Sequence, residues 1–193
     1  GVMVLGARDG RFTKSGEPKT LEPFAASSIP LVTLGTFLLW FGWFGFNGFS
    51  QLAMGTFDDV NAISKIAVNT HLAGAAGTVS AAVVSRLLGG KTDIIMMLNG
   101  ALAGLVAITA EPLTPSPLLA IVIGAIGAII MYFGTKFLEA RHLDDVVGAI
   151  PVHMFAGIFG TLIVPISNPD TNFGTQFTGV ISVCLFSFVL SYI

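Results

Sequence analysis

His153 is the residue in this sequence with the clearest capacity for chemistry. It lies in the uncharged apolar run 146–164, two residues after Pro151, which lacks a backbone donor and loosens the helix ahead of the histidine. A neutral imidazole inside such a run can donate and accept hydrogen bonds or pass on a proton, which makes it a functional candidate. We expect Ala149 and Ala156 to leave room around the ring. The alternative is a core histidine that ties two helices together.

A second group of candidates lies in the stretch 34–50, LGTFLLWFGWFGFNGFS, which carries no charge. On a helix, four of its side chains share one face and span roughly 16 Å. They are Leu39, Trp43, Phe46 and Ser50. Aromatic faces attract cations and a hydroxyl forms hydrogen bonds, so this face is predicted to form the wall of a path or binding site.

The composition indicates an integral membrane protein. Hydrophobic residues make up 53% of the chain and charged residues 10%, with a mean hydropathy of +0.84. No HExxH, GxSxG, phosphate-loop or CxxC motif is present, and the carboxylates lie in or near loops, so we predict no enzyme, metal site or cofactor. The basic residues lack interleaved aromatics, so we expect a lipid bilayer and no nucleic acid as partner.

Six apolar segments are long enough to cross a hydrocarbon core, which takes about 20 residues. We place them at residues 29–49, 62–88, 94–110, 118–138, 146–165 and 176–193. Alternation then puts eight of the nine Lys and Arg residues on one side, with Lys65 opposite. The bias predicts a multi-pass cell-membrane protein whose loop 6–25 is cytoplasmic. Residues 1–5 look like the end of a helix and the sixth segment is cut short, so we expect a piece of a longer protein.

Small residues recur within these segments and predict close helix packing. They include Gly74, Gly77, Gly100, Gly104, Gly124, Gly127, Gly157 and Gly160. We expect Gly42, Gly45 and Gly48 to admit a neighbouring helix in the same way.

Other polar residues in or near the segments favour structural roles. An unpaired amide in lipid is costly, so we expect Asn47, Asn69 and Asn99 to tie helices together by hydrogen bonds. His71 is predicted to be structural and His142 to be a solvated loop residue.

Several motifs together resemble the ammonium transporter family, which includes the Rh proteins. They are LGARDGRF at 5–12, GWFGFNGFS at 42–50, VNTHLAGAAG at 68–77, NGALAGLVAITA at 99–110 and DDVVGAIPVHMFAGIFGTL at 144–162. The resemblance implies an all-α integral membrane protein, an eleven-helix bundle with inverted five-helix repeats that assembles as a homotrimer. Residues 1–193 would be the C-terminal half of a single transmembrane domain: the tail of helix 5 and helices 6 to 11, the last one truncated.

The resemblance also implies roles for individual residues. Ser50 is similar to a serine that binds ammonium at the outer vestibule, and Phe46 to one of two stacked phenylalanines that close the pore mouth. Trp43 is similar to a tryptophan beside the pore histidines, and Leu39 to an apolar pore-lining residue. His153 is similar to the second of two pore histidines, the first of which would lie upstream of this chain.

The function implied is transmembrane transport of ammonium or ammonia, with deprotonation at an outer aromatic vestibule and passage through a hydrophobic, histidine-lined pore. An intact cation in an apolar pore is costly, and removing a proton separates ammonium from potassium, which has none to give up. Two alternatives use the same fold: an ammonium sensor with a fused cytoplasmic domain, and a Rh-type gas channel. The resemblance further implies a cytoplasmic nitrogen-regulatory protein as a partner.

Overall fold

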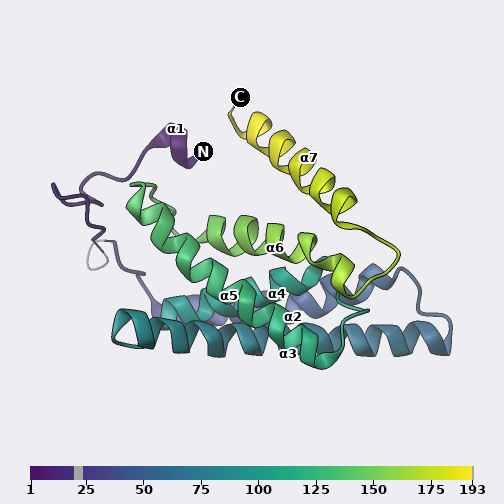
Figure 1. Ribbon diagram of the computed structural model, residues 1–193. Coiled ribbons are helices and arrows are strands. Elements are labelled where there is room, and N and C mark those ends of the chain that lie inside the picture. Colours follow the sequence, from purple (N-terminus) through teal and green to yellow (C-terminus); the bar gives the residue numbers. More distant parts are fainter. Residues whose placement is uncertain (20–23, 193) are drawn as a thin grey trace.

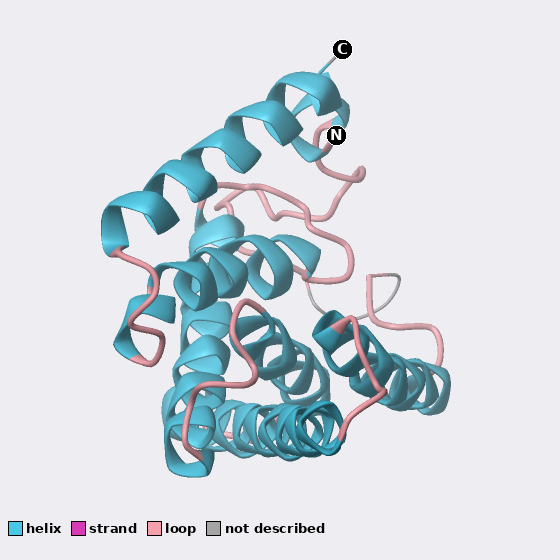
Figure 2. Ribbon diagram, turned by 90° about the vertical axis from the view of Figure 1, so that its right-hand side faces the viewer, coloured by secondary structure: helices cyan, strands magenta, loops and turns pink. Residues whose placement is uncertain are grey.

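The computed structural model describes residues 1–19 and 24–192, so the predictions for residues 20–23 of the cytoplasmic loop and for Ile193 lie outside the described residues. The described part of the chain is helical, with one isolated bridge between Phe12 and Pro18 and no strand. Its long helices run back and forth in a bundle, and the last helix stands apart from the others (Figures 1 and 2).

Each predicted membrane segment contains a helix. The elements are α1 (Val2–Leu5), α2 (Ile29–Gly48), η1 (Phe49–Gln51), α3 (Phe57–Gly89), α4 (Ile94–Thr109), α5 (Pro117–Ala140), η2 (Ile150–Phe155), α6 (Ala156–Leu162), η3 (Val164–Ile166) and α7 (Phe173–Tyr192). Within residues 1–19 and 24–192, four helices are long and apolar enough to span a membrane: α2 with η1, α3, α5 and α7. The other two segments hold shorter apolar helices, Ile94–Thr109 and Ile150–Ile166. This arrangement supports a multi-pass membrane architecture.

The start of α3 differs from the sequence prediction. The helix begins at Phe57 rather than at residue 62, because Thr56 and Asp59 form a capping box. Thr56 Oγ1 accepts a hydrogen bond from the Asp59 backbone N–H at 3.1 Å, and the Asp59 carboxylate accepts one from the Thr56 backbone N–H at 3.1 Å. The cap extends the helix beyond its apolar part into the polar loop.

Glycines bring α3, α4 and α5 into backbone contact, as the sequence predicted. A Cβ on Gly77 would overlap the carbonyl oxygen of Gly100, and a Cβ on Gly104 or Gly124 would overlap the carbonyl oxygen of Ala73. Van der Waals contact of this kind drives helix association where the surrounding solvent is itself apolar.

The corresponding close approach at α2 is not seen among the described residues. No described atom lies within 4 Å of a Cβ built on Gly42, and Cβ atoms on Gly45 and Gly48 would meet Phe49 and Ile63 only at ordinary distances of 3.5 and 3.7 Å. Side chains rather than backbone contacts therefore hold α2 against the described bundle.

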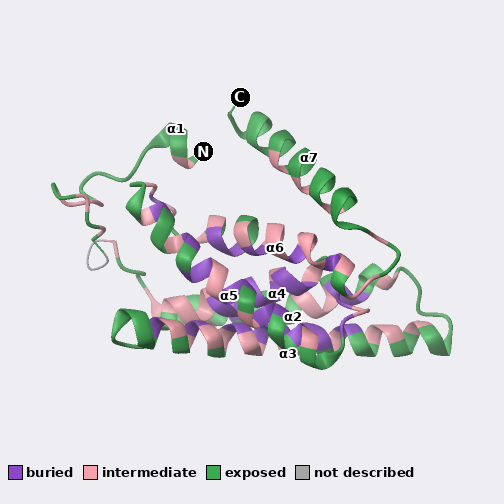
Figure 3. Ribbon diagram, in the orientation of Figure 1, coloured by how far each residue is buried: buried purple, intermediate pink, exposed green. Residues whose placement is uncertain are grey.

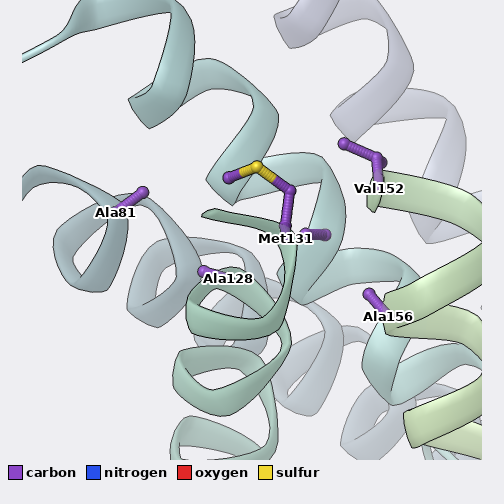
Figure 4. Close-up of a cluster of buried hydrophobic side chains, with 6 residues drawn as sticks. Ala81, Ala128, Met131, Val152 and Ala156 are labelled. Atoms are coloured by element: carbon purple, nitrogen blue, oxygen red, sulfur yellow. The ribbon is translucent and has the colours of Figure 1, made fainter. Parts of the chain in front are cut away.

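The core lies where α3, α4, α5 and the η2–α6 segment meet, and Figure 3 shows buried residues concentrated there. Met131 of α5 fills the space between Ala81, Ala128, Val152 and Ala156 (Figure 4). Small side chains around one flexible thioether let the helices approach without leaving a void. In contrast, α7 contributes no buried residue to the described structure.

The three asparagines tie elements together, as predicted. Asn47 Nδ2 donates to Thr70 Oγ1 at 3.0 Å, which joins α2 to α3. Asn69 donates to two carbonyl oxygens of the loop between α4 and α5, each at 2.9 Å. Asn99 donates to the Val147 carbonyl oxygen at 3.2 Å. These bonds fix the order in which the helices pack.

Candidate functional site

A cavity of about 620 Å³ lies between α2, α4 and the η2–α6 segment. Its lining is mainly apolar and brings together residues far apart in the chain. The lining residues are Leu38, Leu39, Gly42, Trp43, Phe46, Val106, Thr109, Ala110, His153, Gly157 and Thr161. Four of the five predicted site residues, Leu39, Trp43, Phe46 and His153, therefore share one cavity.

The face of α2 in the cavity follows from an unbroken helix. Ser28 caps its N-terminus by accepting a hydrogen bond from the Leu31 backbone N–H at 3.4 Å, and the helix continues to Gly48. Residues spaced by three and four positions consequently lie on one side of it. The ring centroids of Trp43 and Phe46 are 6.1 Å apart along this face.

Ser50 lies beyond this face. It belongs to η1, where the chain tightens into a 3₁₀ turn, and it is not among the residues that line the cavity. Its hydroxyl donates to the Phe46 carbonyl oxygen at 3.0 Å. Ser50 thus follows Phe46 by one helical turn, at the end of this face and outside the cavity. A vestibule role for Ser50 stays a prediction.

His153 lies on a π-helical turn, Ile150–Phe155. The turn begins later than the predicted residue 146, because Asp145 Oδ2 accepts a hydrogen bond from the Ile150 backbone N–H at 2.7 Å and Gly148 has a φ of 76°. Pro151 at the start of the turn agrees with the predicted loosening of the helix. Single π-helical turns of this kind occur frequently at functional sites.

The surroundings of the His153 ring differ in part from the prediction. Ala156 is buried in the core and does not line the cavity with His153. Gly157 and Thr161 line the cavity with His153 in its place, because the wider π-turn rotates the residues that follow. The ring itself lies parallel to that of Trp43, with centroids 6.5 Å apart and an interplanar angle of 10°.

A hydrogen bond to α4 fixes the Trp43 ring. Trp43 Nε1 donates to Thr109 Oγ1 at 2.7 Å, and Thr109 Oγ1 donates to the Leu105 carbonyl oxygen at 2.7 Å. Sequence reasoning missed Thr109. An isolated hydroxyl near the end of the apolar run 94–109 was the only available signal.

The other two histidines lie outside the cavity. The His71 ring lies near Trp40 and Phe44, at centroid distances of 5.5 and 6.2 Å. His142 is exposed in the loop after α5, with its ring 5.2 Å from that of Phe12. Among the described residues, no group of three or more His, Cys, Asp or Glu side chains could hold a metal ion.

An ion-pair cluster closes the end of the bundle where the His153 segment begins. The Arg8 guanidinium binds Asp144 through Nε at 2.6 Å and Nη2 at 2.9 Å, and Arg11 Nε lies 3.3 Å from the same carboxylate. Hydrogen bonds from Arg8 lower the pKa of Asp144 from 3.8 to about 2, against the opposing effect of burial. The next residue, Asp145, caps the π-helical turn. The cluster on Asp144 therefore anchors residues 6–19 next to the segment that carries His153.

This geometry can be compared with known proteins. A family model described as Ammonium Transporter Family matches residues 1–192. The chain belongs to the ammonium transporter family. Ammonium transporter Amt2 of Archaeoglobus fulgidus is 46% identical over 165 residues, which cover 86% of this chain and 34% of the relative. Ammonium transporter Amt1 of Haloferax mediterranei is 35% identical over 203 residues, which cover 99% of this chain and 39% of the relative.

Solved structures agree with the family. A structure of a sensor Amt protein superposes with a TM-score of 0.88 at 34% sequence identity, covering 98% of this chain and 48% of that one. Mep2 of Candida albicans gives a TM-score of 0.83 at 25% identity, covering 98% of this chain and 44% of that one. The chain thus has the fold of a segment of an ammonium-transporter protein, and it spans less than half the length of these two relatives.

Proposed function

We propose that the protein containing this chain transports ammonium or ammonia across the cell membrane, and that residues 1–193 supply one wall of its path as the C-terminal half of a single transmembrane domain. The observation that supports this best is the order of three rings along one apolar cavity. Phe46, Trp43 and His153 follow one another at centroid spacings of 6.1 and 6.5 Å. Such a series can receive a cation at one end and place a neutral species beside an imidazole at the other.

The first step belongs to the end of α2 near Phe46 and Ser50. An aromatic face attracts ammonium by a cation–π interaction worth about 0.5–2 kcal/mol. Deeper in the cavity, an intact cation would lose its hydration without compensation, so the ion gives up a proton before it passes. Potassium cannot do so, and this difference provides selectivity.

His153 takes part in the second step. A neutral imidazole can accept a hydrogen bond from ammonia or donate one to it, and it can also hold a proton in transit. The indole of Trp43 lies parallel to this ring, with the ring centroids 6.5 Å apart. Leu39, nearer the start of α2, continues the apolar wall.

The orientation and the partners are part of the proposal. Residues 6–19, the α3–α4 loop and the α5–η2 loop lie at one end of the bundle (Figure 1). This agrees with the inside–outside alternation of loops on which the charge bias was counted. We propose that this end is cytoplasmic. The family resemblance adds a homotrimer and a cytoplasmic nitrogen-regulatory partner.

The alternatives differ in what they would transport. A sensor would bind ammonium without moving it, and the names of the curated relatives, which are ammonium transporters, favour transport. A gas channel would move ammonia without net charge.

The full-length protein in liposomes tests the proposal. We expect an ammonium pulse to produce uptake that a large excess of potassium does not inhibit. Absence of ammonium-dependent uptake, or equal competition by potassium, would overturn it. Recording current alongside uptake separates a charged process from the gas channel.

A further inference from the structure

The Thr109 hydroxyl makes two hydrogen bonds, one to another helix and one to its own. It accepts a hydrogen bond from the indole N–H of Trp43 at 2.7 Å and donates a hydrogen bond to the Leu105 carbonyl oxygen at 2.7 Å. A hydroxyl has a single donor, and the Leu105 carbonyl oxygen uses it here. The bond to the Leu105 carbonyl oxygen therefore fixes the orientation of the hydroxyl. The lone pairs of Thr109 Oγ1 remain as the acceptor for the indole N–H of Trp43.

The hydrogen bond to Thr109 determines which part of the Trp43 side chain faces the cavity. An indole N–H is a strong donor with no acceptor function, and a free one in an apolar wall would bind water or the lone pair of ammonia. Because Thr109 takes this proton, Trp43 presents its ring to the cavity, parallel to His153 within 10°.

Trp40 shows that a tryptophan on the same helix does not acquire such a partner automatically. Its Nε1 is buried and has no hydrogen-bond partner among the described residues, and its ring packs against Gly74 instead. The pairing of Trp43 is thus a specific feature of the cavity wall.

We propose that Thr109 is a positioning residue for the ammonium path. It holds the Trp43 ring parallel to His153 and keeps the indole N–H out of the cavity, so that passing ammonia meets an imidazole and not a competing donor. The proposal rests on the proposed function for its consequence in transport, but the hydrogen bond itself can be tested separately.

The test uses Thr109→Val, which preserves shape and removes the hydroxyl, and Thr109→Ser, which keeps it. Ultraviolet resonance Raman spectra of the full-length protein, taken as the difference from Trp43→Phe in each background, report the hydrogen bond of this indole. We expect the band of Thr109→Val to move to the position of a free N–H, and that of Thr109→Ser to stay at the wild-type position. Thr78→Val is the matched control, since Thr78 makes the same type of bond to its own helix, to the Gly74 carbonyl oxygen, but does not line the cavity.

Transport kinetics provide the second readout. We expect Thr109→Val to lower the maximal ammonium uptake rate about 3- to 10-fold, the factor that corresponds to one neutral hydrogen bond, and to leave the half-saturation concentration unchanged. The half-saturation concentration should not change because recruitment at the cavity mouth does not involve this bond. If losing a threonine–backbone hydrogen bond lowered the amount of folded protein in general, the rate of the Thr78→Val control would fall as well. Thr109→Ser should restore the rate.

An unchanged indole band in Thr109→Val would overturn the structural part of the proposal, whatever the transport result. A shifted band with wild-type kinetics would overturn the functional part. If the wild-type protein moved no ammonium, the proposed function would fail, and the spectra would still decide whether Thr109 holds Trp43.

Discussion

At the scale of single residues, the imidazole of His153 is the one titratable side chain among the described residues that line the cavity. Its backbone lies in a π-helical turn that Asp145 caps, and its ring lies parallel to Trp43. These contacts restrict the ring without using the polar edge that ammonia would need.

Replacing His153 with Gln separates a pore role from a structural one. Glutamine keeps a donor and an acceptor but cannot hold a proton, so we expect the ammonium-driven current of the reconstituted full-length protein to fall by at least about 10-fold, or potassium to begin to compete. His71→Gln is the control, because His71 lies outside the cavity. A wild-type current and selectivity in folded His153→Gln would show that this ring only ties helices together.

Sequence reasoning found the residues whose types are unusual for their surroundings. A histidine after a proline in an apolar run, and aromatic residues at helical spacing, stand out without a structure. Thr109 did not, because its partner Trp43 lies on another helix and a lone threonine is common in apolar segments. Ala156 was expected to leave room around His153, and it is a buried core residue that does not line the cavity.

At the scale of elements, backbone contacts between α3 and α4 hold the scaffold behind the cavity. Gly77→Ala would place a methyl group against the Gly100 carbonyl oxygen. We expect a loss of about 1–3 kcal/mol in stability from this overlap, which outweighs the gain of up to about 1 kcal/mol in helix propensity. Gly35→Ala is the control, since no described atom lies within 4 Å of its Cβ. Thermal unfolding of the purified proteins in detergent measures both, and equal or higher stability of Gly77→Ala would contradict the close approach.

The ion-pair cluster predicts a pH dependence. The pKa of Asp144 in the folded protein is about 2, below its ordinary value of 3.8, so its ionised form stabilises the fold above about pH 4 and this stability disappears as the pH falls toward 2. Because water reaches the Arg8 side chain, we expect about 1–2 kcal/mol. Asp144→Asn should destabilise the protein at pH 7 and make no difference at a pH well below 2. Asp9→Asn, which alters an exposed carboxylate of the same loop as Arg8, should leave the stability unchanged at both pH values. An effect of Asp144→Asn that does not depend on pH would argue against the ion pair.

Hydropathy located the elements well and their ends less well. The apolar segments follow directly from the exclusion of charge from lipid, so each predicted segment contains a helix. The ends of α3 and of the His153 segment depend on Thr56, Asp59, Asp145 and Gly148, whose hydrogen bonds and backbone angles leave no trace in an average over many residues.

At the scale of the whole molecule, the charge distribution predicts the orientation. Residues 6–19 hold four of the nine basic residues, whereas the loop between η1 and α3 holds none. In a background without Cys184, we expect an impermeant thiol reagent added to intact cells to label Gly55→Cys and to leave Ser15→Cys unlabelled. Both sites are exposed, so labelling of the second and not the first would reverse the topology.

The central claim is that ammonium crosses the membrane through the cavity between α2, α4 and η2–α6. Gly42 lines this cavity, whereas Gly35 lies earlier on the same helix, and a Cβ on either meets no described atom within 4 Å. The measurement is the ammonium-driven current of the reconstituted full-length protein, freed of Cys184 and other cysteines, after a membrane-permeant aromatic thiol reagent has modified Gly42→Cys or Gly35→Cys. We predict that modification abolishes the current of Gly42→Cys and leaves that of Gly35→Cys intact. A full current in Gly42→Cys, with complete modification confirmed by mass spectrometry, would contradict the assignment of the path to this cavity.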